Sequence, residues 1–192
     1  REEIRRYEPF NEQEREDKKE ILRQMEQADH ILTRDNRNAH ITVSAWIMDR
    51  DRKKVLMAYH NLYQSWAWLG GHADGDADLK AVALKEIREE SGLESVRFVT
   101  EDIFSLEILT VDGHEKRGSY VPSHLHLNVT YLLEADPELP LRIKEDENSE
   151  IGWIGVEEIE RRSTEKWFVE RIYSKLCKKA QSLRNGKLAI LE

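Results

Sequence analysis

The sequence predicts an α+β fold, in which several strands are accompanied by only a few helices. Apolar residues recur at every second position in residues 40–48 and 124–133, as they do in half-buried strands. Apolar residues recur three and four positions apart in residues 12–32 and in the segment between Gly71 and Gly92, as they do in helices packed on a core. Because few helices intervene between the strands, an α+β mixture is expected.

The first expected element is a helix over residues 12–32, which Asn11 caps. Its first half, residues 12–20, is polar on every side and is expected to protrude or fray. Its second half carries a narrow apolar stripe, which favours a helix docked on its own domain over a helix that binds a partner. The stripe consists of Ile21, Leu22, Met25, Ala28, Ile31 and Leu32.

The segment after residue 38 is expected to hold the strands. After the first strand, a turn at residues 49–52 and a second strand lead to a tryptophan-rich segment that ends in Gly70 and Gly71. A loop rich in glycine and charge, residues 112–122, precedes the strand at residues 124–133. The other strands are expected at residues 53–59, 63–69, 95–100, 103–111 and 151–154, with a turn at residues 136–140.

The last part of the chain is expected to be helical. A helix starts within residues 156–160, and Ser163 or Thr164 caps a final helix that ends at Gly186. Cys177 lies within the pattern of this helix and is expected to be a buried or half-buried structural thiol. The apolar side of the helix consists of Phe168, Ile172, Leu176, Ala180 and Leu183.

The composition limits the classes of function. The chain has 192 residues and a formal net charge of −8, which favours one domain and disfavours a nucleic-acid backbone or an anionic membrane as its main partner. A phosphorylated small molecule is still compatible, because a bound metal ion inverts the local field. A single cysteine fits a reducing compartment. Since no apolar run approaches the ~20 residues of a membrane span and the first residues lack a signal core, a cytoplasmic protein is expected.

The most informative segment covers residues 71–93. Glu86, Glu89 and Glu90 fall within about one helical turn, and positions three and four apart share one face of a helix. Such a triplet is most often a solvated acidic face, here beside Lys85. Three carboxylates on one face also repel each other unless a cation lies among them, and Mg²⁺ or Mn²⁺ prefers oxygen ligands. The glycine turn before the helix, the glycine stop after it and its apolar side favour this second interpretation.

This segment resembles the box of the Nudix hydrolases, G-x5-E-x7-R-E-U-x-E-E-x-G-U, in which U is a bulky aliphatic residue. Ala77 stands in place of the first glutamate and Lys85 in place of the arginine. The resemblance covers about residues 38–160 and implies the Nudix fold, an α/β/α sandwich with a mixed sheet and added N- and C-terminal helices. Seven of the nine fixed positions match, namely Gly71, Glu86, Ile87, Glu89, Glu90, Gly92 and Leu93.

The chain is accordingly divided into two parts. Residues 1–37 are expected to form an N-terminal helical extension packed on the domain, and residues 38–192 a Nudix-like domain that includes a C-terminal helix. Members of the family are often dimers, so the resemblance makes a homodimer one option and leaves the oligomeric state open.

The two departures from the box bear on catalysis more than on the fold. Lys85 keeps the charge of the arginine but lacks its planar bidentate fork. Ala77 removes a carboxylate from the box. The flanking Asp76 and Asp78 replace it at best in part, because a shift of one residue points a side chain in another direction. Since the glutamate cluster is retained, an active enzyme is favoured over a catalytically weak module that senses a nucleotide. An isomerase of the isopentenyl diphosphate type, which uses a related fold, is disfavoured because its cysteine motif is missing.

The resemblance implies metal-dependent hydrolysis of a diphosphate linkage in a nucleoside diphosphate derivative, a small phosphorylated molecule. Glu86, Glu89 and Glu90 are the expected catalytic residues and ligands of Mg²⁺ or Mn²⁺, with main-chain carbonyls around Gly71 completing the shell. Glu86 is a candidate either for a ligand or for the base. A further carboxylate is expected from an acidic loop that is otherwise an ordinary surface loop, and its candidates are Glu145, Asp146, Glu147 and Glu150.

The strand around residue 126 is the second informative feature. Alternation places His124, His126 and Asn128 on one face, which favours a cleft wall that contacts phosphate as much as it favours a solvent-facing strand. In the preceding loop, Lys116 and Arg117 are expected to bind substrate, with a merely solvated loop as the alternative. Further candidates are His114 in the loop and His72 near the metal shell, whereas Trp66 and Trp68 are expected in the core or at the rim.

Overall fold

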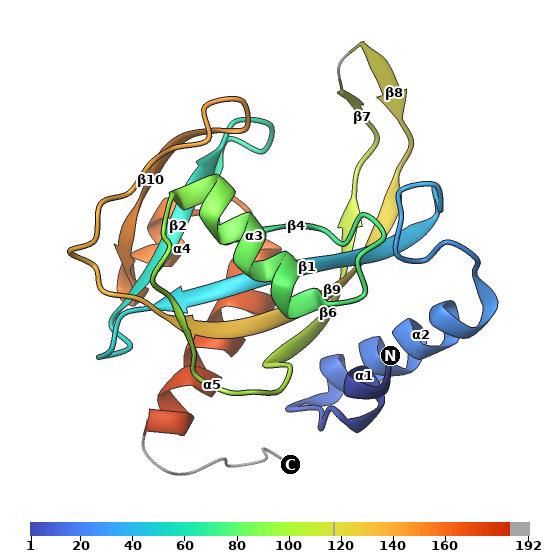
Figure 1. Cartoon of the computed structure of the whole chain (residues 1–192), viewed down its shortest axis with the longest axis horizontal. Coiled ribbons are helices and arrows are strands. Elements are labelled where there is room, and N and C mark those ends of the chain that lie inside the picture. The colour runs from blue at the N-terminus through green and yellow to red at the C-terminus, as the bar shows by residue number, and fades with distance from the viewer. Residues whose placement is uncertain (117, 185–192) are drawn as a thin grey trace.

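The computed structural model describes residues 1–116 and 118–184. Within these residues, eight strands form one mixed sheet that has helices on both faces (Figure 1). The helices α1, α2 and α3 pack on one face, and α4 and α5 pack on the other. The predicted α/β/α sandwich with added terminal helices is thereby confirmed. Two predictions, for Arg117 and for the helix end at Gly186, concern positions outside the described residues.

The central strand is β1, Ala39–Met48, which is buried along its whole length. It pairs in parallel with β9, His124–Glu134, and antiparallel with β2, Lys54–His60, and β4, Leu69–His72. The path through the sheet is β10-β2-β1-β9-β5, with β3 beside β2 and β6 beside β9. These further strands are β3 Ser65–Ala67, β5 Arg97–Phe98, β6 Ser105–Val111 and β10 Asn148–Gly155.

One face of β1 changes character along the strand. Trp46 and Met48 belong to the apolar cluster under α4 and α5. Ser44, Thr42 and His40, which lie two, four and six residues before Trp46, line a cleft instead. Since side chains alternate between the two faces of a strand, the cleft and this apolar cluster share one face of the sheet.

The helix α3, Leu79–Ser91, starts and ends as its sequence predicts. The Asp78 side chain accepts a hydrogen bond of 3.1 Å from the backbone N–H of Ala81, and Gly92 ends the helix with a φ of 71°. Buried apolar residues hold this helix against the sheet, namely Leu79, Val82, Ala83 and Ile87. The remaining helices are α1 Glu2–Arg6, α2 Glu12–Gln27, the 3₁₀ turn η1 Val156–Glu158, α4 Ile159–Arg162, the π-helical segment η2 Phe168–Tyr173 and α5 Ser174–Arg184.

The expected cap of the final helix is wrong. The Ser163 hydroxyl lies 3.1 Å from that of Ser65, and the backbone N–H of Thr164 donates to the same Ser65 oxygen. Both residues therefore fasten the segment before the helix to β3, and the helix begins later, at residue 166. Cys177 is half-buried, and burial raises the pKa of its thiol to about 12, which agrees with the expected structural thiol.

The N-terminal helix differs from expectation at both ends. The Asn11 side chain caps α2 as predicted, but the helix ends at Gln27, because Ala28 adopts an extended backbone and His30 a φ of 55°. The chain turns here so that the Ile31 carbonyl accepts a hydrogen bond from the N–H of Ile41 in β1.

The polar first half of α2 does not protrude, because it holds a buried ionic network. Glu14 is fully buried, and its Oε1 lies 3.1 Å from the Nζ atoms of both Lys175 and Lys179 in α5. Tyr7 donates to the other carboxylate oxygen at 2.5 Å, and Lys175 also contacts Glu107 of β6 at 2.9 Å. Burial opposes the charge on Glu14, but the two ammonium groups outweigh it and lower its pKa to about 2.

The expected loop at residues 112–122 contains a hairpin. β7, His114–Lys116, pairs antiparallel with β8, Ser119–Val121, and the hairpin projects from the body of the protein (Figure 1). Gly118 lies at its turn with a φ of 76°, a conformation that glycine adopts without strain. Three-residue strands with charged side chains carry too little alternation to be recognised in the sequence.

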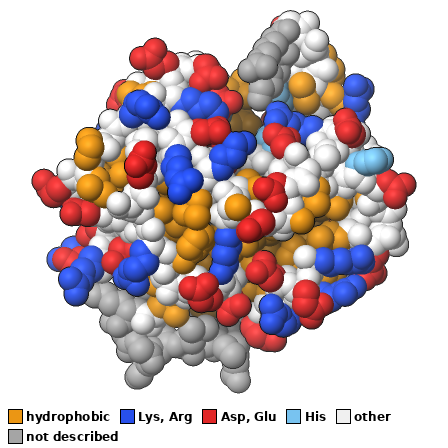
Figure 2. Space-filling view, viewed as in Figure 1, with side chains coloured by type: hydrophobic (Ala, Val, Ile, Leu, Met, Phe, Trp, Pro, Cys, Tyr) orange, Lys and Arg blue, Asp and Glu red, His pale blue; other side chains and the backbone are white. Residues whose placement is uncertain are grey.

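The surface carries charged side chains of both signs. On the face shown in Figure 2, acidic and basic side chains are interspersed. In the part of the chain that the structure describes, no helix is long and apolar enough to cross a membrane.

Candidate active site

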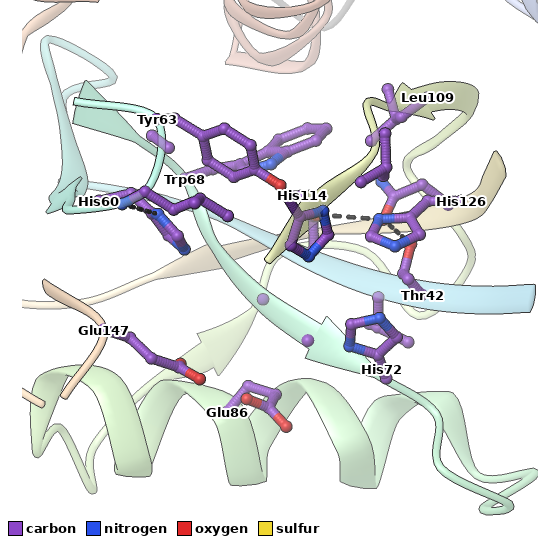
Figure 3. A pocket seen from close by; sticks show the side chains of 18 of the residues that line it. Thr42, His60, Tyr63, Trp68, His72, Glu86, Leu109, His114, His126 and Glu147 are labelled. Carbon is purple, nitrogen blue, oxygen red and sulfur yellow. Dashed lines mark hydrogen bonds between the residues drawn. The ribbon is translucent and has the colours of Figure 1, made fainter. Parts of the chain in front are cut away.

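A cleft of about 1050 Å³ opens beside the N-terminal half of β1. Its walls come from β1, β2, β4 and β9, from α3, from the β7–β8 hairpin and from the segment before β10. Figure 3 shows Glu86 on α3, Glu147 facing it, and His72 and His126 toward the other end of the same pocket.

The glycine pair in β4 allows α3 to approach the sheet closely. A Cβ atom on Gly70 would lie 2.3 Å from the carbonyl oxygen of Val43 in β1. A Cβ atom on Gly71 would lie 2.4 Å from the carboxyl carbon of Glu86. The backbone of β1 therefore requires glycine at position 70, whereas a side chain at position 71 would displace the Glu86 carboxylate.

The three glutamates of α3 all line the cleft, but their environments differ. Glu86 and Glu90 are buried, whereas the Glu89 side chain is 43% exposed. Glu90 Oε2 accepts a hydrogen bond of 3.0 Å from the N–H of Gly70. Burial raises the pKa of Glu90 to about 8, and burial together with the charge of Glu89 raises the pKa of Glu86. Burial therefore disfavours the charged forms of Glu86 and Glu90.

Two lysines, Lys85 and Lys144, lie 3.8–4.0 Å from glutamates of α3. Lys85 Nζ is 3.8 Å from Glu89 and 4.0 Å from Glu86. Lys144, which the sequence did not single out, lies 3.9 Å from Glu89 and 3.1 Å from Glu147. Lys85 therefore neighbours the glutamates as the arginine of the box would, at distances longer than a direct hydrogen bond.

The other departure from the box lies away from the cleft. Ala77 is exposed in the turn before α3 and does not line the cleft. Asp78 caps the helix, and Asp76 accepts a hydrogen bond from the N–H of Asp78. Neither aspartate lines the cleft, so both have local roles in the turn.

The acidic loop before β10 contributes to the cleft in part. Asp146 and Glu147 line it, whereas Glu145 and Glu150 do not. The charge of Glu147 is among the causes that raise the pKa of Glu86, which places the two carboxylates in one electrostatic environment.

The predicted histidines lie on the cleft wall. His124 and His126 line it as half-buried residues, and Asn128 forms its buried polar floor by accepting hydrogen bonds from the hydroxyls of Thr42 and Ser44. The parallel register of β1 and β9 sets His40 beside His126.

Two more histidines join this wall from other strands. The ring centroid of His72, at the end of β4, lies 5.0 Å from that of His40 and 4.9 Å from that of His126. His40 was not singled out, although the alternation of His40, Thr42 and Ser44 carries the same signal of a polar face as residues 124–128. Burial lowers the pKa of His40, and burial with the neighbouring His72 lowers the pKa of His126 to about 2.

The structure describes only some of the predicted phosphate-binding side chains of the hairpin. His114 lines the cleft, whereas the side chain of Lys116 and the whole of Arg117 are outside the described residues. Arg34 and Arg37, which the sequence analysis did not propose, also line the cleft. Asp74 holds the Arg34 guanidinium through a hydrogen bond of 2.8 Å.

The two tryptophans before the glycine pair have different surroundings. Trp66 is 8% exposed and packs edge-on against Tyr59, in agreement with a core position. Trp68 lines the cleft together with Tyr63 and Phe168. The part of the cleft lined by these three rings is its aromatic end, where His60 lies beside Tyr63 with the ring centroids 4.7 Å apart.

A model described as the NUDIX domain matches residues 38–176. The chain belongs to the Nudix family. The predicted Nudix-type diphosphate hydrolase is confirmed at the level of the family, whose members act on small phosphorylated substrates and generally use divalent metal ions. No curated protein sequence matches the chain.

Solved structures of Nudix proteins share the fold at low identity. A C. elegans Ap4A hydrolase binary complex is 18% identical, with a TM-score of 0.53 over 77% of this chain and 98% of that one. The E. coli dihydroneopterin triphosphate pyrophosphohydrolase is 13% identical, with a TM-score of 0.53 over 72% of this chain and 95% of that one. The MutT protein from Methanosarcina mazei Go1 is 17% identical, with a TM-score of 0.51 over 76% of this chain and 98% of that one.

Proposed function

We propose that this Nudix protein is a Mg²⁺-dependent hydrolase that cleaves a diphosphate linkage in a nucleoside diphosphate derivative. The observation that carries the proposal is the convergence of Glu86, Glu89 and Glu90 on one cleft, where two of the three carboxylates are buried. Mn²⁺ is the alternative ion, because both ions take oxygen ligands.

The donor set fits such an ion. Glu86 and Glu90 present buried carboxylates next to the backbone of Gly70 and Gly71, and Glu89 adds a more exposed one. Burial raises the pKa of two of these groups, and a divalent cation among them would favour their charged forms. When bound, the metal ion neutralises phosphate charge and lowers the pKa of a water molecule.

The other cleft residues are proposed to bind and orient the substrate. Arg37 and Lys144 supply positive charge at the cleft, and His124 and His126 are proposed to contact phosphate oxygens, as are Lys116 and Arg117. Glu147 faces Glu86 across the cleft and joins Glu86 as a candidate for the base (Figure 3).

The aromatic end of the cleft is proposed to receive the nucleoside base. Tyr63 is 43% exposed and lines the cleft near Trp68, so both rings offer a face on which a base stacks. This arrangement supports a nucleoside derivative over an inorganic diphosphate.

A substrate screen tests the proposal. Nucleotide sugars, dinucleoside polyphosphates, ADP-ribose and nucleoside triphosphates are each incubated with Mg²⁺ or Mn²⁺. We expect hydrolysis of at least one class, and its collapse in the Glu89→Gln and Glu90→Gln variants. Glu94→Gln is the matched control, because Glu94 is exposed just beyond the box and does not line the cleft.

The second candidate is a Nudix-like module that senses a nucleotide with little catalysis. The long distances from Lys85 to the glutamates favour it, because they leave the carboxylates less firmly held than an arginine fork would. Nucleotide binding without turnover of any compound in the screen would support this candidate and contradict the hydrolase. The domain division, the homodimer and the cytoplasmic location stay predictions.

A further inference from the structure

A second cluster of potential metal ligands lies in the cleft, and it consists of histidines. His40 comes from β1, and His124 and His126 come from the adjacent parallel strand β9. One ring nitrogen from each lies within 4.8 Å of the other two. The cluster is therefore built by the register of two central strands and not by a loop.

The hydrogen bonds of two rings fix which nitrogen faces the cluster. His40 Nδ1 lies 3.0 Å from the Asn36 carbonyl oxygen, and His124 Nδ1 lies 2.9 Å from the Pro122 carbonyl oxygen. A carbonyl only accepts, so each Nδ1 carries the proton and each Nε2 presents a lone pair. A carbonyl that holds the outer N–H of a ring is the usual support for a metal-ligating histidine.

The distances within the cluster suit a tetrahedral ion. His124 Nε2 and His126 Nε2 are 3.2 Å apart. Two nitrogen ligands at ~2.0–2.1 Å from a tetrahedral zinc ion lie roughly 3.3 Å apart, so these two rings are already spaced as ligands. The ligand nitrogen of the third ring, His40, lies within 4.8 Å of both.

The third ring also carries an unsatisfied group. His40 is 4% exposed, and its Nε2 is buried with no hydrogen-bond partner among the described residues. A buried acceptor without a partner is destabilising, which makes such groups rare in folded proteins. A cation held by this lone pair removes that destabilisation.

We propose that His40, His124 and His126 form a binding site for a zinc-class transition-metal ion, separate from the carboxylate site of α3. Imidazole nitrogen suits Zn²⁺, whereas Mg²⁺ and Mn²⁺ prefer carboxylate oxygen, so the two ends of the cleft select different metals. Three protein ligands leave one coordination position, and because His124 and His126 line the cleft, that position faces the space where a substrate would lie.

Zinc binding tests the site directly, with no need for enzymatic activity. The affinity of the purified protein for Zn²⁺ alone is measured against a chromophoric chelator, with Mg²⁺ in excess to occupy carboxylate oxygens. Co²⁺ then replaces Zn²⁺, and its visible absorption spectrum reports tetrahedral nitrogen coordination. We expect a single tight Zn²⁺ site, weakened about 10–100-fold or more in His124→Ala and in His126→Gln.

Two controls separate this site from other metal-binding groups. His30→Asn removes an exposed histidine outside the cleft, at a position whose φ of 55° asparagine tolerates, and should leave the Zn²⁺ affinity unchanged. Glu89→Gln alters the carboxylate site and should also leave it unchanged. A cooperative thermal unfolding transition in each variant shows that it is folded. The Zn²⁺-dependent rise in the midpoint of this transition should be lost in His124→Ala and kept in Glu89→Gln.

Two results would overturn the proposal. One is wild-type Zn²⁺ affinity in both cluster variants, and the other is an affinity lost in Glu89→Gln but kept in His124→Ala, which would assign the ion to the glutamates. The outcome is independent of the proposed hydrolase, because the absence of Mg²⁺-dependent turnover leaves the zinc measurement unchanged.

Discussion

Replacing Gly71 with alanine tests how closely the Glu86 carboxylate must lie to β4. The new Cβ atom would lie 2.4 Å from the carboxyl carbon, whereas ordinary van der Waals contact begins at 3.4 Å. The carboxylate must therefore recede by about 1 Å, and a misplacement of this size in a catalytic arrangement costs about 10²-fold in kcat. The contact is made with the end of a flexible side chain, so we expect the fold to stay intact.

The assay compares kcat at saturating Mg²⁺ for the wild type and for Gly71→Ala, with the best substrate from the screen. Gly152→Ala is the matched control, because Gly152 lies in β10, outside the cleft, and a Cβ atom there meets nothing within 4 Å. We expect this control to keep the wild-type kcat. Thermal unfolding of all three proteins separates a displaced carboxylate from a damaged fold.

A wild-type kcat in Gly71→Ala would refute the reasoning, because it would show that the position of Glu86 does not limit the reaction. An equal loss of kcat in Gly152→Ala would refute it as well, since that substitution leaves the cleft untouched.

Three further predictions concern the ionic network and the box. Glu14→Gln leaves the buried ammonium groups of Lys175 and Lys179 without their carboxylate and should lower the free energy of unfolding by about 3–5 kcal/mol in denaturant titrations; a change no larger than that of a surface variant would contradict it. The folded-state pKa of Glu14 is lowered from 4.5 to about 2, so its stabilisation is present above pH 4.5 and is lost as the pH falls toward about 2. Between pH 4.5 and about 2, the free energy of unfolding should therefore fall more steeply with falling pH for the wild type than for Glu14→Gln. Equal slopes for the two proteins would contradict this prediction. Lys85→Arg should raise kcat, because a guanidinium fork spans the 3.8 Å to Glu89 better than an ammonium group does. Ala77→Glu should leave kcat unchanged, because residue 77 is exposed outside the cleft. Steady-state kinetics in which Ala77→Glu raises kcat and Lys85→Arg does not would contradict both predictions.

Local sequence signals identified most of the elements. Alternation predicted β1 and β9, Asp78 and Gly92 fit the ends of α3, and Asn11 caps α2. Two of the failures share one cause, because each depends on contacts with distant residues. The polar start of α2 is buried only because α5 brings two lysines to Glu14, and Ser163 leaves the expected cap position to contact Ser65.

The candidate site divides in the same way. The box supplied Glu86, Glu89 and Glu90 within one helix, where spacing alone sets which side chains share a face. Lys144 and His40 were missed, because nothing in their local sequence shows that they meet α3 or β9. The parallel pairing of β1 with β9 joins residues far apart in the chain, and period-two patterns do not specify which strands pair or in what register.

The sequence by itself determined the family, the glutamate face of α3 and the glycine turn before it, because these are set by short-range spacing and by backbone conformation. Only the tertiary structure decided that the Glu86 carboxylate lies against Gly71, and that nitrogens of three histidines from two strands lie within 4.8 Å of one another. The physical reason is that helix faces repeat within a few residues, whereas strand register and the docking of α3, α2 and α5 are set by burial of apolar surface across the whole chain.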